Sequence, residues 1–157
     1  MDDKVDTAEL LQKAMKACSG REHCISDIRA LLDRWGAGDE STKEHIINRL
    51  LKEKFIDEHR YSRAFALDHF RHSHWGRVKI TMGLRNKKVS PEAIASGLEA
   101  IDDEEYMALL RKTVEDQRKK IRAKNRYDMK GKLLRHALGR GFESDLVYRM
   151  INTLFNE

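Results

Sequence analysis

The side chains in this sequence that could take part in binding are mainly cationic, and many lie in the middle of the chain. Residues 60–88 hold eight Lys and Arg residues against one acidic residue, Asp68, for a net charge of +7. Arginine makes paired hydrogen bonds to carboxylates and phosphates, and one acidic residue cannot neutralise the segment through pairs three or four positions apart. We therefore predict a binding surface for acidic protein or DNA phosphate, although a solvated helix surface would have the same composition. The predicted binding residues here are Arg60, Arg63, Arg71, Arg77, Lys79, Arg85, Lys87 and Lys88.

A second cationic block follows towards the C-terminus. Residues 111–140 contain 12 basic and 3 acidic residues, for a net charge of +9, and residues 118–126 are the densest part. Salt screens such charges beyond about 8–10 Å, so the block can act only on something docked against it. It predicts a contact with a polyanion or a filament, and the alternative is a polar helix that joins two units. The predicted binding residues here are Arg126, Lys130, Lys132 and Arg135.

Metal binding and catalysis are poorly supported by the remaining polar residues. Three histidines lie within residues 69–74, but zinc needs three or four converging ligands, and nothing places residues 18–24, with their two cysteines and one histidine, nearby. The acidic run 102–105 has consecutive side chains that point in different directions, which favours a helix start over a metal site. No glycine-rich phosphate loop or nucleophile motif is present. We predict no metal, no cofactor and no enzymatic activity.

The composition favours helix throughout. One proline and nine glycines in 157 residues leave few breaks, and the common residues are strong helix formers. No apolar run reaches the length of about 18 residues that would indicate a membrane span, and the acidic segment 1–4 does not begin a secretory signal. Cys18 and Cys24 lack a disulfide framework, so we expect reduced thiols and a cytoplasmic protein.

Start and stop signals divide the chain into nine predicted helices. Gly36 and Gly38 are predicted to end the second helix, and Gly76 to break the fourth. Ser41 and Glu44 form a predicted capping box for the third helix. The residues predicted to begin or cap helices are Asp6, Ser26, Ser41, Asp57, Ser90, Asp102 and Ser144.

A weak internal repeat groups these helices in threes. Three apolar pairs recur at spacings of 52 and 53 residues, and each is followed four residues later by Gly36, Lys88 or Gly141. The pairs are Ile28 with Leu32, Ile80 with Leu84, and Leu133 with Ala137; Ile47 with Leu51, Ile94 with Leu98, and Val147 with Ile151 repeat in the third helices. We predict an all-α, tandem array of three three-helix repeats over residues 5–56, 57–101 and 102–157. The array should be elongated or curved, because each unit is too small to bury its own faces.

Residues 50–65 resemble the central signature of the RecX family, which is an apolar pair, a turn, an Ile/Leu-Asp-Asp/Glu step, then Arg-Phe/Tyr and Ala-Phe. Residues 75–85 and the Arg-Gly-Phe turn at residues 140–142 match later elements of the same family. The resemblance covers roughly residues 8–153. Lys88 stands where many members have glycine, and the Trp75-Gly76 turn is shorter than the usual aromatic-Gly-Pro form.

This resemblance implies a regulator that acts by binding. RecX-like proteins are tandem three-helix repeats that bind the RecA–DNA filament along its groove, block its growth, and inhibit strand exchange and co-protease activity. By that resemblance we expect a monomer that regulates DNA repair and the SOS response, with the RecA recombinase filament as its partner.

A sequence-nonspecific DNA-binding protein is the alternative. Short three-helix units resemble helix-turn-helix readers, and the sequence pI is about 9.2. This alternative predicts tight binding to single- or double-stranded DNA without any recombinase, and a steep dependence on salt.

Overall fold

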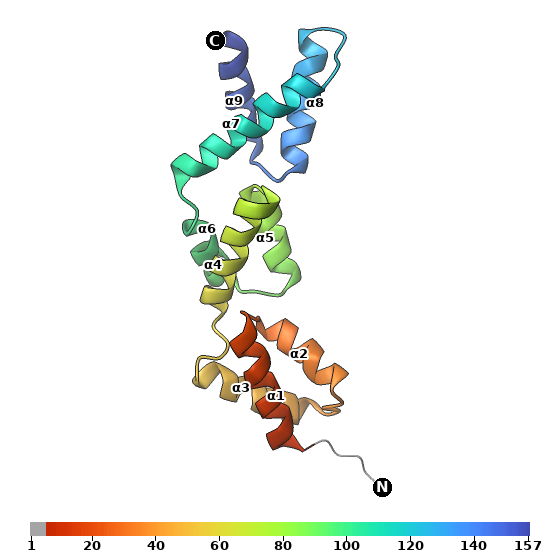
Figure 1. The fold of residues 1–157 in the computed structure, drawn as a ribbon, viewed down its shortest axis with the longest axis vertical. Helices are drawn as coiled ribbons and strands as arrows, with labels where there is room; N and C mark the ends of the chain where they lie inside the picture. Colours follow the sequence, from red (N-terminus) through yellow and green to blue (C-terminus); the bar gives the residue numbers. More distant parts are fainter. Residues whose placement is uncertain (1–5) are drawn as a thin grey trace. The chain divides into compact units, whose positions relative to one another are not determined.

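The computed structural model describes residues 6–157, which form nine α-helices, one π-helical turn and no β-strands (Figure 1). The predicted all-α repeat fold is confirmed. The acidic segment 1–4 and residue 5, the first of the first predicted repeat, lie outside the described residues. The elements are α1 (Thr7–Gly20), α2 (Ile25–Arg34), α3 (Glu40–Lys52), α4 (Glu58–Asp68), η1 (His69–Ser73), α5 (Arg77–Asn86), α6 (Pro91–Glu99), α7 (Asp103–Lys120), α8 (Arg126–Gly139) and α9 (Ser144–Asn156).

The chain packs into two compact units. One contains residues 6–64 and 84–97, and the other contains residues 65–83 and 98–157. The middle helices α4, α5 and α6 each contribute residues to both units. The repeat boundaries expected at residues 57 and 102 stay a prediction.

The first unit has its core among α1, α2 and α3, which pack against one another (Figure 1). Ile28 and Leu32, predicted to form the inner face of α2, are fully buried. Burial of apolar area is the main stabilising contribution of such a small bundle. The buried cluster consists of Leu10, Ala14, Ile28, Leu32, Ile46, Ile47, Leu50 and Ile56.

The second unit is built around aromatic side chains and the three long helices α7, α8 and α9. Tyr106 of α7 is fully buried, with its ring centroid 6.0 Å from that of Phe70 and 5.4 Å from that of Phe142. Offset or tilted aromatic pairs at these distances stabilise a core beyond the burial of their area. Leu133 and Ala137 of α8 are also buried, as the repeat pattern predicts.

The three turns that follow α2, α5 and α8 have the same backbone conformation at equivalent positions of the repeat. Gly36, Lys88 and Gly141 have φ values of 84°, 60° and 96°, in the left-handed region. The residue after each donates its backbone N–H five positions back, to the carbonyls of Leu32, Leu84 and Ala137 (2.9, 3.1 and 3.3 Å). This is the hydrogen bond of a Schellman turn, which ends a helix by satisfying a free carbonyl. The middle helix of each predicted triplet therefore ends in the same way.

Several helix starts agree with the predictions and two do not. The carboxylates of Asp6, Asp57 and Asp102 accept backbone N–H groups of the first helical turn, and the Ser90 hydroxyl does the same. The predicted caps at Ser26 and Ser41 are wrong. α2 begins at Ile25 with Cys24 as its N-cap residue. α3 begins at Glu40, and the Asp39 carboxylate accepts the Thr42 N–H (2.6 Å).

Two further expectations differ from the structure. Gly76 does not break α4. The helix continues into the π-helical turn η1 and ends before Gly76, at His74, which lies in the left-handed region with φ 57°. In α3, Ile46 and Leu50 are fully buried while Leu51 is exposed, so the inward pair lies one residue earlier than Ile47 with Leu51. Because residues 46–47 and 50–51 are both pairs of adjacent apolar residues, the sequence does not distinguish the two registers.

Gly141→Ala is expected to lower the free energy of unfolding by about 2–4 kcal/mol, because an added Cβ would lie 2.7 Å from the Lys79 backbone nitrogen at a left-handed φ. Gly139→Ala is the matched control, since among the described residues no heavy atom outside its chain neighbours and its own helix backbone lies within 4 Å of its added Cβ. Urea denaturation of both variants measures the difference. Equal stability of the two would contradict the tight packing of this turn.

Candidate functional site

The twelve predicted binding residues fall into two groups in the structure. Some pair with a carboxylate of the same chain, and the others have none among residues 6–157. Those with a carboxylate partner are Arg60, Arg77, Lys87 and Lys132. Those without one are Arg63, Arg71, Lys79, Arg85, Lys88, Arg126, Lys130 and Arg135.

Arg60 lies against the turn that ends α3. Its Nε donates to Glu22 (2.5 Å), and one terminal nitrogen donates to the carbonyls of Lys54 (3.1 Å) and Phe55 (3.3 Å). Lys54 itself has a φ of 62°. The guanidinium therefore joins three segments of the first unit, while the Arg60 side chain stays 40% exposed.

Lys87 is tied to the start of α2. Its Nζ lies 2.8 Å from the Asp27 carboxylate, and its backbone carbonyl accepts the Ser26 hydroxyl (2.7 Å). Burial alone would raise the pKa of Asp27, but the hydrogen bond and charge of Lys87 hold that pKa below its ordinary value. The Ser26 side chain therefore fixes Lys87 instead of capping a helix.

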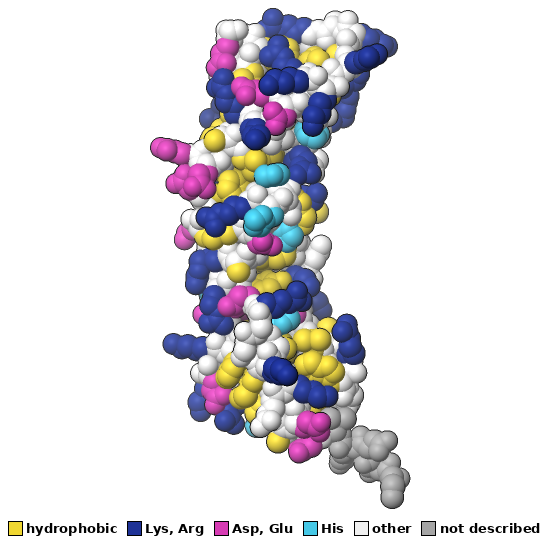
Figure 2. Space-filling model, in the orientation of Figure 1, with side chains coloured by type: hydrophobic (Ala, Val, Ile, Leu, Met, Phe, Trp, Pro, Cys, Tyr) yellow, Lys and Arg dark blue, Asp and Glu magenta, His cyan; other side chains and the backbone are white. Residues whose placement is uncertain are grey.

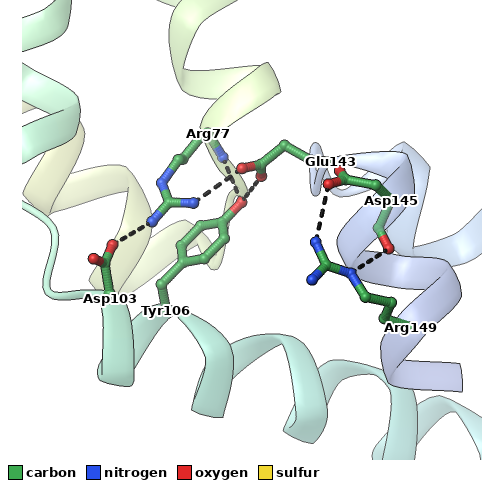
Figure 3. Close-up of polar contacts among 6 residues, drawn as sticks. All are labelled: Arg77, Asp103, Tyr106, Glu143, Asp145 and Arg149. Carbon is green, nitrogen blue, oxygen red and sulfur yellow. Dashed lines mark hydrogen bonds and ion pairs between the residues drawn. The ribbon is translucent and has the colours of Figure 1, made fainter. Parts of the chain in front are cut away.

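Arg77 is the centre of a polar network in the second unit (Figure 3). Its terminal nitrogens donate to Glu143 (2.9 Å) and Asp103 (2.8 Å), and its guanidinium carbon lies 3.8 Å from the centroid of the Tyr106 ring. The Arg77 side chain is only 24% exposed, whereas that of Asp103 is 92% exposed. Solvent weakens the exposed pair, so Glu143 is the more important partner.

Tyr106 completes this network. Its hydroxyl accepts the backbone N–H of Arg77 (3.0 Å) and donates to the Glu143 carboxylate (Figure 3). Burial raises the pKa of Tyr106, and the hydrogen bond to Glu143 raises it further, so the phenol stays protonated as a donor. The network fixes the N-terminus of α5 against α7 and the start of α9.

The residues without a carboxylate partner are available for another molecule. Arg63, Arg71, Arg85, Lys88 and Arg135 are exposed and make no ion pair within the described part of the chain. Lys79 lies over the Trp75 ring at 4.9 Å, and Trp75 in turn stacks on His69 at 4.0 Å. On the face drawn in Figure 2, Lys and Arg side chains gather over α7–α9.

A groove between α8 and α9 is not predicted by the sequence. Two exposed tyrosines line it, Tyr127 (88% exposed) and Tyr148 (55% exposed), beside the predicted residues Lys130 and Arg135. Its volume is about 330 Å³. Tyr127 follows a cationic run, so its isolation from apolar neighbours could have indicated an exposed position, but Tyr148 directly follows Leu146 and Val147 and gives no such signal.

The structure holds no evident metal centre or membrane segment in the described residues. Within residues 6–157, no three His, Cys, Asp or Glu side chains are grouped as a metal ion requires. In the same range, every helix is too short or too polar to span a bilayer. The described surface instead carries exposed cationic and aromatic side chains.

Tyr106→Phe is expected to lower the free energy of unfolding by about 1–2 kcal/mol, because the Arg77 N–H and the Glu143 carboxylate lose a partly buried partner. Tyr148→Phe is the control, since it removes the same hydroxyl from an exposed ring. Thermal denaturation of both variants, followed by circular dichroism, measures the effect. Equal melting temperatures would show that the network does not stabilise the second unit.

Comparison with known proteins identifies the family. The model of the second three-helix domain of RecX matches residues 57–98, and that of the third matches residues 103–151. The regulatory protein RecX of Prosthecochloris aestuarii is 29% identical, over 95% of each chain. Its namesake from Halalkalibacterium halodurans is 25% identical over 85% of this chain, and that from Lactobacillus johnsonii is 23% identical over 97%. The chain spans 50% and 57% of those last two relatives.

Solved structures agree on the fold. The crystal structure of RecX from Lactobacillus salivarius superposes with a TM-score of 0.85 at 16% identity, over 96% of this chain and 97% of that one. A second crystal structure of regulatory protein RecX gives 0.83 at 22% identity, over 94% of this chain and 73% of that one. The two family models together match more than half of the sequence. The chain therefore belongs to the RecX family of regulatory proteins.

Proposed function

We propose that this protein binds the filament of a RecA recombinase and mainly inhibits its recombination and co-protease activities. One observation carries the proposal: the two RecX domain models cover every one of the twelve cationic residues predicted to bind a partner. The protein then acts by contact, as a cytoplasmic monomer, and catalyses no reaction.

The residues that make these contacts are those without a carboxylate of their own. A guanidinium already held by Glu22 or Glu143 must lose that partner before it binds another, and this loss offsets the gain. Arg63, Arg71, Arg85, Lys88 and Arg135 are exposed and form no ion pair among residues 6–157, so this cost is small, although Arg63 interacts with the charge of Asp57 and Arg135 with that of Asp128. A nucleoprotein filament presents both of the groups that arginine binds best, carboxylates of the protein and phosphates of the DNA.

Lys88 gives additional support. Its φ of 60° is a conformation that glycine adopts more readily than lysine. The two corresponding turn positions are Gly36 and Gly141. Lysine is less stable than glycine in this backbone conformation, so its presence in an exposed turn supports a role in contacting a partner.

Nonspecific binding to DNA is the competing function. It requires the same cations but no recombinase, so binding to DNA alone at two salt concentrations separates the two functions. Inhibition of the recombinase that persists at a salt concentration where the chain no longer binds free DNA favours the regulator.

The double charge reversal Arg63→Glu with Arg71→Glu is expected to raise the concentration for half-inhibition of the cognate recombinase's DNA-dependent ATPase about tenfold or more, which corresponds to about 1.4 kcal/mol of binding free energy. Both side chains are exposed and unpaired within residues 6–157, so the fold should be retained, with an unchanged circular dichroism spectrum.

Lys16→Glu with Lys52→Glu is the matched control. Both of these lysines are exposed, lie outside the predicted binding residues and give the same change in net charge. If both double variants weaken inhibition equally, overall charge and not this set of residues is responsible. If neither does, the proposed contact residues are wrong.

A further inference from the structure

Two neighbouring hollows on the second unit have not been assigned a role. The first is the groove between α8 and α9. Its floor is apolar and open, with Leu134, Ile151 and Gly131, and its rim carries the rings of Tyr127 and Tyr148. An added Cβ at Gly131 would meet only the Arg135 guanidinium within 4 Å. The groove therefore has room for a flat group beside two aromatic rings.

The second hollow, of about 310 Å³, lies between the end of α7, the start of α8 and the end of α9. Within the described residues, three cations surround its Phe155 ring: Arg118 at 4.0 Å, Arg126 at 5.2 Å and Lys130 at 5.3 Å from the centroid. None of them pairs with a carboxylate in that part of the chain, although Arg126 donates to the Phe155 carbonyl (2.6 Å). Like charges held so close together favour an anion from solution.

Lys130 joins the two hollows. It lines the tyrosine groove and also lies over Phe155. The acidic residue of the groove, Asp128, is already engaged, because its carboxylate accepts the Lys124 N–H (3.0 Å) and pairs with Lys132 (3.3 Å). A flat aromatic position and an anion position thus adjoin on one surface of the α7–α9 bundle.

A nucleotide is the ligand that matches this combination. Its base has a π face that stacks on tyrosine, and its phosphate is the anion that arginine and lysine bind. The base must be unpaired, since a base inside a duplex cannot enter a groove between two helices. An acidic peptide would use the cations but would leave the exposed rings without a matching group.

We propose that the α7–α9 bundle binds an unpaired nucleotide of single-stranded nucleic acid. The base lies in the groove of Tyr127 and Tyr148, and the adjoining phosphates lie at Arg118, Arg126 and Lys130. This site does not depend on the proposed regulation of a recombinase, because it acts on nucleic acid alone.

The test is fluorescence anisotropy of the full chain with a labelled oligothymidylate of about 15 nucleotides, compared with an abasic strand of the same length. The abasic strand keeps the phosphates and lacks the bases. Wild-type protein is expected to bind the thymidylate strand about 5- to 50-fold more tightly, because stacking on aromatic side chains supplies that difference. Tyr127→Ala with Tyr148→Ala should remove the preference, and the two Tyr→Phe changes should keep it.

Two further variants separate the base position from the phosphate position. Gly131→Leu should fill the groove and remove the preference, whereas Gly139→Leu on the same helix should not. Arg118→Gln with Arg126→Gln should weaken binding to both strands alike and reduce the salt dependence by about 0.7 per lost phosphate contact. Lys16→Gln with Lys52→Gln is the charge-matched control, and thermal denaturation checks that each variant is folded.

Three results would overturn the proposal. One is equal affinity of the wild-type chain for the abasic and thymidylate strands. Another is an unchanged preference in a folded double-alanine variant. The third is displacement of the thymidylate strand by a glutamate decapeptide as effectively as by unlabelled thymidylate, which would assign the groove to acidic peptides.

Discussion

A guanidinium beside a buried core needs a carboxylate, and this requirement determines which cations remain for a partner. Arg77 lies over the buried Tyr106 ring and contacts Glu143 and Asp103. Removing the Arg77 charge from water without a partner would cost far more than its pairs contribute in net stability. Arg60 and Lys87 also pair with carboxylates, those of Glu22 and Asp27, although their side chains stay 40% and 44% exposed. The exposed cations without an ion pair among residues 6–157 have no such requirement, and they are the residues that we propose contact a partner.

Much of the fold could be predicted from the sequence, because its signals are local. Asp57 and Asp102 each cap a helix by accepting the backbone N–H of the residue three positions later, so the signal lies within four residues of sequence. The pattern of Gly36, Lys88 and Gly141 identified three equivalent helix ends because each Schellman turn spans six residues. Ser26 shows the limit of such signals: its hydroxyl donates to the Lys87 carbonyl, 61 positions away, and no cap motif predicts that.

The candidate site was harder to predict because tertiary packing decides it. Segment 60–88 contains almost no acidic residues, which predicts that its cations have no carboxylate partners. Their partners lie elsewhere in the chain, such as Glu22, 38 positions from Arg60, and Glu143, 66 positions from Arg77. Tyr127 and Tyr148 likewise share a groove only because α8 and α9 pack together. Charge density in the sequence thus predicts cationic segments, but it does not show which of their cations pair with carboxylates elsewhere in the chain.

The central claim is that internal carboxylates separate structural cations from contact cations. Arginine modification by phenylglyoxal, read by mass spectrometry with and without the cognate recombinase filament, tests it most directly. Arg63 and Arg71 should react quickly in the free protein and become protected on the filament, whereas Arg60 and Arg77 should react slowly in both states. Fast modification of Arg60 and Arg77, together with unprotected Arg63 and Arg71 on the filament, would contradict the account.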